Sequence, residues 1–276
     1  LVLGPLQDAS PLVKVSTIVL CTALLSFLFS LLYGDYSWTD RLWSTLPVLM
    51  GWIYTHNAQY TKPALVASLL ITLWGVRLTF NFARRGGYTG EEDYRWNILE
   101  KRINNPGLWM LFNILFISGY QQFLFIGFTS PLMILTTEQS TAFRPLSFIA
   151  IFLFFLCLLI ETVADQQQYT FQQAKYGLLP KKDHLFKEYE QGFRTSGLFK
   201  FSRHPNYFGE IGVWWAIYLY CVSFSDSYLH FSGFGVILLT LLFVGSTIFT
   251  ESITASKYPQ YAKYQKQVPS ILFRFW

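Results

Sequence analysis

Seven apolar runs, each close to the length of a membrane span, constrain the fold of this chain more than any other feature. The runs cover residues 12–33, 42–56, 63–83, 107–135, 145–168, 206–224 and 231–254. A helix needs about 20 apolar residues to cross the hydrocarbon core, where only helices and closed barrels satisfy the backbone. Because only 13% of the residues are charged, the sequence predicts an all-α integral membrane bundle of about seven helices.

Two of the runs depart from the usual length. The second run is short and is compatible with a tilted or partly re-entrant helix. The fourth run is long, and Gly119, Gly127 and Pro131 are expected to bend or end it. Gln121 and Gln122 in the same run are expected to form hydrogen bonds across helices, and the alternative is that they contact a ligand. No internal repeat or low-complexity linker divides the chain, so residues 1–276 are predicted to form a single membrane domain.

Basic residues lie unequally in the segments that separate the runs. With seven spans, residues 34–41, 84–106, 169–205 and 255–276 fall on one side, and they carry most of the Lys and Arg. The other side holds only Lys14, Lys62 and Arg144. Because cytosolic loops are enriched in Lys and Arg, this asymmetry supports seven spans and a cytosolic C-terminus. The net charge of +5 is then explained by these loops, and nucleic acid is not an expected partner.

The metal-binding and disulfide classes are not favoured. Cys21, Cys157 and Cys221 all lie in apolar runs, which argues against a disulfide framework or a zinc site. No His/Cys cluster has the spacing of metal ligands, and no glycine-rich phosphate loop is present. We therefore expect no metal.

Polar residues gather at the start of the sixth run, in the segment Ser202-Arg203-His204-Pro205-Asn206-Tyr207-Phe208-Gly209-Glu210. Pro205 suits the first turn of a helix, where its missing N–H costs nothing. Asn206 and Glu210 are four residues apart and therefore share one face of that helix. Ionisable groups beside hydrocarbon are costly unless a ligand or partner satisfies them. The alternative is a polar helix cap whose side chains reach the membrane interface.

Polar stripes at helical spacing mark three further runs at the same basic ends. They consist of Arg77, Asn81 and Arg84; of Glu161, Asp165, Gln168 and Gln172; and of Glu251, Thr254, Tyr258 and Tyr261. Such stripes, together with Asn206 and Glu210, predict one polar cavity that opens to the cytosol. A cavity flanked by basic loops suits a water-soluble anionic cofactor, since Arg matches phosphate oxygens. The apolar remainder suits a lipid-like substrate. The alternative is that Arg77 pairs with Glu161 or Glu251 only to hold the bundle together.

The motif Arg203-His204-Pro205-Asn206-Tyr207-Phe208-Gly209-Glu210, preceded by Gly197-Leu198-Phe199, resembles the C-terminal signature of the steroid 5-alpha-reductase superfamily. Glu161 with Ala164-Asp165, and the closing Glu251, Tyr258-Pro259, Tyr261 and Val268-Pro269, fit the same pattern. The resemblance is firm over about residues 161–276, and the whole chain looks most like a little-characterised branch of this superfamily. The Arg203-His204-Pro205 segment and this ending also resemble the isoprenylcysteine carboxyl methyltransferases, which are distant relatives.

The resemblance implies an NADPH-dependent oxidoreductase of lipid or steroid metabolism, acting on CH–CH groups in the endoplasmic reticulum membrane. A bacterial inner membrane is the alternative location. Asn206 and Glu210 would lie around the nicotinamide, while Arg77, Glu161 and Asp165 would line the cofactor pocket. The remaining candidate cofactor-binding residues, from the stripes and the motif, are Asn81, Arg203, His204, Glu251, Tyr258 and Tyr261. The candidate catalytic residues are Glu210 and Tyr207. Tyr207 would act as an acid or stack near the nicotinamide.

The sequence also departs from this resemblance. Steroid reductases place a Glu before the Leu-Pro of the second helix and a Tyr three residues before the Arg that matches Arg77. Here those positions hold Thr45 and Trp74, which puts a 3-oxosteroid substrate in doubt. Two alternatives to a reductase stay open. One is a methyltransferase that uses S-adenosylmethionine on a lipid or prenylated substrate, and the other is a non-catalytic lipid-binding protein.

Overall fold

The computed structural model describes residues 9–137 and 141–274, and all of their regular secondary structure is helical. The predicted all-α class is therefore confirmed for these residues. The chain divides into two compact units. Unit 1 comprises Leu1–Ala150 and Ile217–Leu238, and unit 2 comprises Ile151–Ala216 and Leu239–Trp276.

Five helical stretches in the described residues are long and apolar enough to cross a membrane. They are Pro11–Tyr33, Lys62–Ala83, Pro106–Thr137, Pro145–Lys175 and Gly233–Lys257. Each coincides with a predicted run, which makes this a membrane protein by the length and composition of its helices. The other two predicted runs coincide with shorter helices, α4 (Leu46–Asn57, 12 residues) and α12 (Pro205–Val222, 18 residues).

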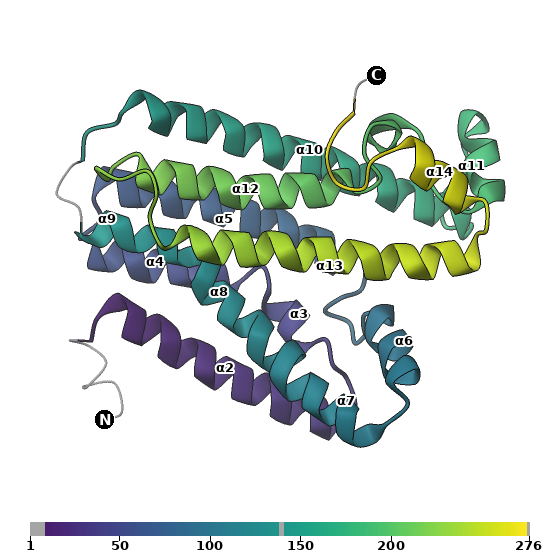
Figure 1. Ribbon diagram of the computed structural model, residues 1–276, viewed down its shortest axis with the longest axis horizontal. Helices are drawn as coiled ribbons and strands as arrows, with labels where there is room; N and C mark the ends of the chain where they lie inside the picture. Colours follow the sequence, from purple (N-terminus) through teal and green to yellow (C-terminus); the bar gives the residue numbers. More distant parts are fainter. Residues whose placement is uncertain (1–8, 138–140, 275–276) are drawn as a thin grey trace. The chain divides into compact units, whose positions relative to one another are not determined.

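Unit 1 begins with α2 (Pro11–Tyr33), the short α3 (Trp38–Leu42), α4 and α5 (Lys62–Ala83) (Figure 1). After a loop come α6 (Tyr94–Ile103) and a long broken helix. A proline stands in the first turn of α2, α4 and α5, where its fixed φ favours the helix and its missing N–H has no partner to lose. Gly34 ends α2 in the left-handed conformation, with φ at 62°.

The fourth run is interrupted at two of the three predicted positions. It consists of α7 (Pro106–Phe112), η1 (Asn113–Tyr120), α8 (Gln121–Thr129), η2 (Ser130–Met133) and α9 (Ile134–Thr137). The π-helical η1 contains Gly119, and the 3₁₀-helical η2 contains Pro131. Gly127 has a different role, because a Cβ atom there would lie 3.1 Å from the Cα atom of Gly235. Gly127 therefore allows a close contact between two backbones.

Hydrogen bonds across helices hold α2 against this broken helix. The Thr22 hydroxyl donates to Gln122 Oε1 at 3.0 Å, and Gln122 Nε2 donates to Ser26 Oγ at 3.4 Å. One turn further along α2, Asn113 Nδ2 donates to Ser30 Oγ at 2.7 Å. The bonds that Gln122 was predicted to form across helices are confirmed. They satisfy side chains that hydrocarbon cannot.

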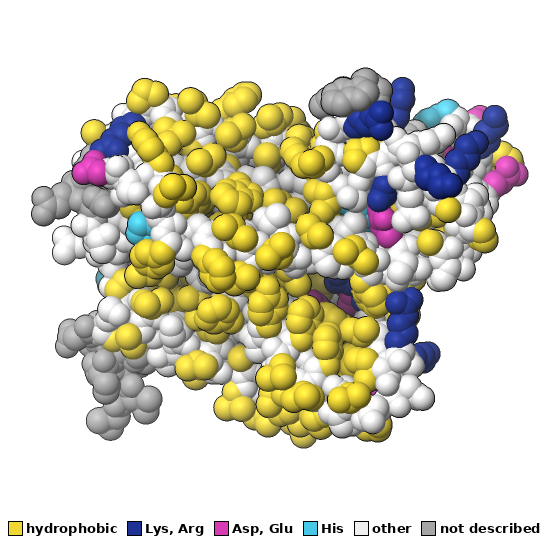
Figure 2. Space-filling view, viewed as in Figure 1, with side chains coloured by type: hydrophobic (Ala, Val, Ile, Leu, Met, Phe, Trp, Pro, Cys, Tyr) yellow, Lys and Arg dark blue, Asp and Glu magenta, His cyan; other side chains and the backbone are white. Residues whose placement is uncertain are grey.

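Unit 2 contains α10 (Pro145–Lys175) from Ile151 onward, η3 (Asp183–Leu185), α11 (Phe186–Gln191), η4 (Gly197–Lys200), and α12 up to Ala216. It closes with α13 (Gly233–Lys257) from Leu239 onward and α14 (Tyr261–Gln267). Hydrophobic side chains cover the lengths of α10 and α13, whereas Lys and Arg gather over α11 and α14 (Figure 2). This contrast separates an apolar helical part from a basic end, as expected where spans meet cytosolic loops.

The segment after α14 runs back along the residues that precede α12. The backbone N–H groups of Arg203 and His204 donate to the carbonyls of Pro269 and Ser270, both at 2.9 Å. The Ser202 hydroxyl donates to the carbonyl of Ile271 at 2.8 Å. Because the first N–H groups near a helix start lack partners within the helix, this tail satisfies donors that would otherwise be unpaired.

Candidate functional site

The polar segment before α12 is held at a helix start, as its sequence predicts. Pro205 is the first helical residue, and the His204 carbonyl accepts from the Phe208 N–H at 3.1 Å. Asn206, Tyr207 and Glu210 follow in the first two turns. The helix sets the directions of these three side chains, and the tail that pairs with residues 201–204 fixes the position of the helix start.

Arg203 and Glu251 form a buried two-point ion pair that joins the start of α12 to α13. Arg203 Nε lies 2.6 Å from Glu251 Oε1, and Nη2 lies 2.9 Å from Oε2; the two side chains are 9% and 8% exposed. The third nitrogen, Nη1, donates to the carbonyls of Gln265 and Val268. Paired forks of this kind are among the stronger charge-assisted contacts. The guanidinium is thus fully engaged within unit 2.

Three further side chains complete the environment of the Glu251 carboxylate. His204 Nε2 lies 3.0 Å from Oε1, Gln265 Nε2 donates to Oε2 at 2.8 Å, and the Tyr261 hydroxyl donates to Oε1 at 3.4 Å. Burial raises the pKa of Tyr261, and the neighbouring Glu251 charge adds to this effect, so the phenol stays protonated and able to donate. Four of the predicted site residues, Arg203, His204, Glu251 and Tyr261, therefore form one network.

A second polar group lies where α12 meets α10. Asn206 Nδ2 donates to Asp165 Oδ1 at 3.3 Å, and Glu210 Oε1 accepts from Trp214 Nε1 at 3.2 Å. The Glu161, Asp165 and Glu210 side chains are buried, each less than 5% exposed. Three carboxyl groups buried in one unit are costly to hold as charges in an apolar setting. Such groups are candidates for binding a ligand that offers hydrogen-bond donors.

Glycine allows the close approach of these two helices. A Cβ atom at Gly209 would stand 2.6 Å from the Cβ atom of Glu161 and 2.8 Å from the Cys157 carbonyl. One at Gly212 would overlap Cys157 Sγ. Small residues at these positions let the backbones of α10 and α12 pack directly on each other. This contact sets Glu161 beside the turn of α12 that carries Glu210.

Tyr207 extends the first network. Its ring stacks on the His204 imidazole, with centroids 5.0 Å apart and planes 22° apart, and it meets Phe243 of α13 edge-on at 4.9 Å. Tyr207 is thus held between a polar partner that contacts Glu251 and an apolar partner on α13. This arrangement orients the phenol and leaves its side chain partly exposed.

Tyr258 lies in a separate contact near the basic loops. Lys175 Nζ donates to the Tyr258 hydroxyl and to the Gly192 carbonyl, both at 2.7 Å. Burial alone would raise the pKa of Tyr258, but Lys175 beside the hydroxyl outweighs it and holds the pKa below its usual value. Gly192 has φ at 88°, and a Cβ atom there would overlap the Tyr258 ring. Tyr258 therefore links α10, α11 and α13.

Ten of the twelve predicted site residues belong to unit 2, and the other two, Arg77 and Asn81, belong to α5 in unit 1. Within unit 1, Arg84 Nε and Nη2 donate to Asn81 Oδ1 at 3.0 and 2.7 Å, so two members of that stripe contact each other. Of the two residues that depart from the reductase pattern, Trp74 is fully buried in α5 and Thr45 precedes α4.

Sequence reasoning missed several residues of these networks. The carbonyls of Gln265 and of residues 268–271 accept from Arg203, His204 and Ser202, which lie far from them in the chain. The Gln265 side chain also donates to the Glu251 carboxylate. Lys175 contacts Tyr258 across 83 residues. No local spacing signals such contacts; only the Val268-Pro269 ending of the family pattern pointed to this segment.

Comparison with known proteins gives a family. Residues 26–268 match the family described as "Protein of unknown function (DUF1295)". A relative in Schizosaccharomyces pombe, "Uncharacterized protein C594.04c", is 34% identical over 264 residues, which cover 89% of this chain and 76% of the relative. No solved structure matches the chain. The matched range contains all twelve predicted site residues.

Proposed function

This chain belongs to the DUF1295 family. From the motif of residues 203–210 and the buried polar groups around it, we propose that the protein is an integral-membrane, NADPH-dependent reductase of the steroid 5-alpha-reductase type. It would act on an activated carbon–carbon double bond of a lipid or steroid-like substrate. The observation that carries the proposal is the set of buried carboxyl groups on α10 and α12, with the partly buried Asn206 amide that contacts one of them and the ordered network beside it. Residues 203–210, the motif that resembles the reductase signature, contribute side chains to these polar groups and to the network.

The hydrogen-bonding side chains Glu210 and Asn206 fit a nicotinamide carboxamide. A carboxamide presents N–H donors and a carbonyl acceptor, and Glu210 and Asn206 offer the complementary groups one helical turn apart. Glu210 would accept from the amide N–H groups and Asn206 would donate to its carbonyl. When bound, the cofactor supplies the hydride, and the protein's contribution is to orient it and exclude water. Asp165 holds the Asn206 amide in place.

Arg203 and His204 act as positioning residues in this proposal. The guanidinium of Arg203 is taken up by Glu251 and two carbonyls, so its charge is neutralised inside unit 2. Its effect is to fix the start of α12 and hence the directions of Asn206 and Glu210. Phosphate contacts would fall to other basic groups, such as the exposed lysines of α11 and α14.

Tyr207 is the proposed proton donor. Reduction of an activated double bond leaves a carbanion or enolate that must gain a proton, and a phenol held at a fixed position can supply it. Stacking on His204 and the edge contact with Phe243 hold the ring without using its hydroxyl. Tyr207→Phe should therefore lower turnover while leaving cofactor binding nearly unchanged.

The test is a thermal-shift titration of the full chain in a nonionic maltoside detergent. NADPH, NADH and S-adenosylmethionine are titrated separately into the parent, into Glu210→Gln and into Glu190→Gln, an exposed control on α11. Glutamine keeps the acceptor for Trp214 but loses the charge. We expect NADPH to stabilise the parent and the control, and to bind Glu210→Gln roughly ten- to a hundred-fold more weakly.

Other outcomes decide between the alternatives. Stabilisation by S-adenosylmethionine and not by NADPH would indicate a methyltransferase, and no response to any of the three would indicate a non-catalytic lipid-binding protein. If Glu210→Gln gains as much from NADPH as the parent, Glu210 does not contact the cofactor. Loss of NADPH absorbance on addition of a membrane lipid extract to the parent would show that the extract contains a reducible substrate.

A further inference from the structure

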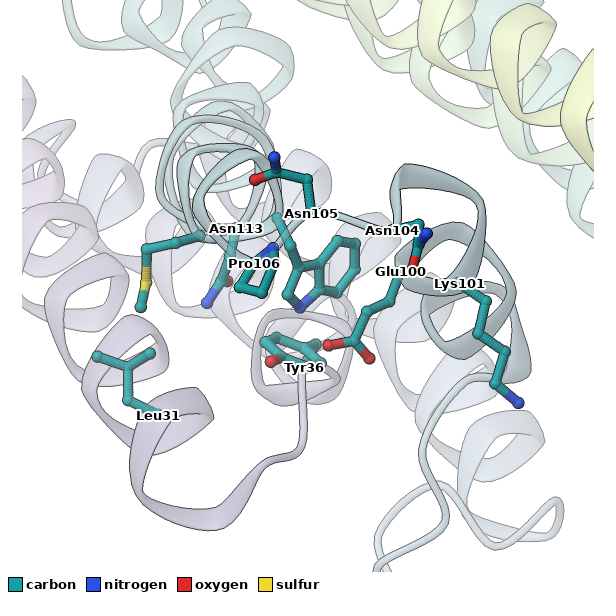
Figure 3. A pocket seen from close by; sticks show the side chains of 10 residues that line it. Leu31, Tyr36, Glu100, Lys101, Asn104, Asn105, Pro106 and Asn113 are labelled. Atoms are coloured by element: carbon teal, nitrogen blue, oxygen red, sulfur yellow. The ribbon is translucent and has the colours of Figure 1, made fainter.

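Unit 1 contains a pocket of about 420 Å³ that the proposed reductase site does not use (Figure 3). It lies where the end of α2 meets the connection between α6 and α7. Leu31 and Met110 form an apolar part of its lining, and Tyr36, Glu100 and Trp109 form a part that is aromatic and acidic. The size is that of a small-molecule site.

The pocket lies at the edge of two candidate membrane spans. Leu31 is near the end of the span Pro11–Tyr33, and Met110 is in the second turn of the span Pro106–Thr137. Both side chains are substantially exposed. The lining that lies beyond these spans, Tyr36 and Glu100, belongs to the loop after α2 and to α6. One end of the pocket is thus at the depth of acyl chains and the other at the depth of lipid headgroups.

The pocket lining carries one carboxylate, that of Glu100, and one ammonium group, that of Lys101. Figure 3 shows the Glu100 carboxylate pointing toward the Tyr36 ring, whereas the neighbouring Lys101 side chain extends away from that ring. Among the described residues, the Glu100 carboxylate makes no hydrogen bond or ion pair. A carboxylate beside an aromatic ring is a recurring way to bind an ammonium group.

A buried hydrogen-bond donor also lines the pocket. The Trp109 side chain is only 4% exposed, and its Nε1 has no hydrogen-bond partner within the part of the chain that the structure describes. The ring is held edge-on to Tyr36, with centroids 4.8 Å apart, and stacks on Phe112. Buried indole N–H groups usually find an acceptor. A ligand oxygen would satisfy this one.

Two of the other polar lining residues already make hydrogen bonds within the chain. Asn105 Oδ1 accepts from the Leu108 N–H at 3.0 Å, which caps α7. Asn113 donates to Ser30 and accepts from Ser118. Beside the Tyr36 ring, the Glu100 carboxylate and the Trp109 N–H donor call for a cation and an acceptor within the same molecule.

From these contacts we propose that the pocket binds the headgroup of a zwitterionic phospholipid. The ammonium lies between the Glu100 carboxylate and the Tyr36 ring, a phosphate oxygen accepts from Trp109 Nε1, and the first part of an acyl chain follows Leu31 and Met110. This site is independent of the proposed reductase activity, because it consists of residues from other elements.

The test is a thermal-shift titration of the full chain in the same detergent, with dihexanoyl phosphatidylcholine and dihexanoyl phosphatidylglycerol as probes of equal chain length. We expect the choline lipid to stabilise the parent at lower concentration than the glycerol lipid. Glu100→Gln should weaken the binding of the choline lipid roughly three- to ten-fold. Glu190→Gln, the exposed control, should leave it unchanged. Trp109→Phe should weaken the binding of both lipids, since both carry a phosphate that would accept from Trp109 Nε1.

Three results would overturn the proposal. They are equal stabilisation by the two lipids, a preference for the choline lipid that survives in Glu100→Gln, and equal stabilisation by phosphocholine without acyl chains. The last result would indicate a soluble ligand instead of a lipid. NADPH titrated into Glu100→Gln should behave as in the parent, so failure of this proposal and failure of the reductase assignment are distinguishable.

Discussion

Gly209 on α12 faces Glu161 on α10 so closely that a Cβ atom at Gly209 would stand 2.6 Å from the Cβ atom of the glutamate. The backbone of one helix therefore rests on the other at the turn that carries Glu210. A glycine in the middle of a helix lowers helix stability. Here the glycine permits the close contact between α10 and α12, and this contact brings Glu161 next to the turn that carries Glu210.

Gly209→Ala should destabilise the protein by about 1–3 kcal/mol, because the added methyl group has no room against Glu161 and the Cys157 carbonyl. Gly245→Ala on α13 is the matched control, since a Cβ atom there has nothing within 4 Å. The control should be neutral or more stable by up to about 1 kcal/mol. Thermal unfolding in detergent without cofactor measures both. Equal stability of the two variants would contradict the close packing.

Glu251→Gln should lower the free energy of unfolding by about 3–5 kcal/mol, because it leaves the buried Arg203 charge without its counter-charge. Glu190→Gln removes a charge from an exposed position and should change stability by less than about 0.5 kcal/mol. Denaturation of both variants without ligand measures the difference. A small effect at Glu251 would mean that the pair is solvated.

Asp40→Asn should change how stability depends on pH. The pKa of Asp40 is raised to about 6, chiefly by burial and also by the nearby Asp93 charge, while Arg95 opposes the rise. A carboxyl whose pKa is higher in the folded than in the unfolded protein stabilises the fold at low pH. That contribution is lost as the pH rises from about 4 through about 6, at no more than about 1.4 kcal/mol per pH unit.

Asparagine at position 40 keeps an acceptor for Trp96 Nε1, which donates to Asp40 at 2.8 Å, but it does not titrate. Thermal unfolding of the parent and of Asp40→Asn between pH 4 and pH 8 checks the prediction. The stability of the variant relative to the parent should rise with pH. A difference that stays constant over this range would show that Asp40 titrates normally.

Deleting residues 269–276 should destabilise the start of α12. The deletion removes the carbonyls that accept from Arg203, His204 and Ser202, at roughly 1 kcal/mol for each hydrogen bond. Pro269→Ala keeps the carbonyl and serves as the control, with an expected change well below that of the deletion. Limited proteolysis near residue 203 gives a local measurement of the same effect.

Residues 57–62 should face away from the cytosol if the chain has seven spans. Gln59→Cys in a Cys21→Ala background should react with a membrane-impermeant maleimide added to sealed vesicles from the non-cytosolic side only. Lys187→Cys on the exposed face of α11 is the opposite control and should react from the cytosolic side. Labelling of both positions from one side would exclude an odd number of spans between them.

Much of the local structure could be predicted because its causes are local. Apolar runs of span length predicted where the long helices lie, and Pro205 predicted the start of α12. The i, i+4 spacing placed Asn206 and Glu210 on one face of that helix. Gly119 and Pro131 predicted the breaks in the fourth run, which the structure fills with π and 3₁₀ turns. Each of these features depends on neighbours within a few residues.

The sequence by itself determined the helical class, the order of the helices and the polar stripes, since helix periodicity and hydrophobic length are properties of short segments. Only the tertiary structure decided that Glu251 is the partner of Arg203, that Gly209 rests on Glu161, and that the tail after Val268 satisfies the start of α12. These contacts join segments that lie far apart along the chain. They depend on which helix surfaces fit together, and that fit is decided by the packing of all the side chains between them.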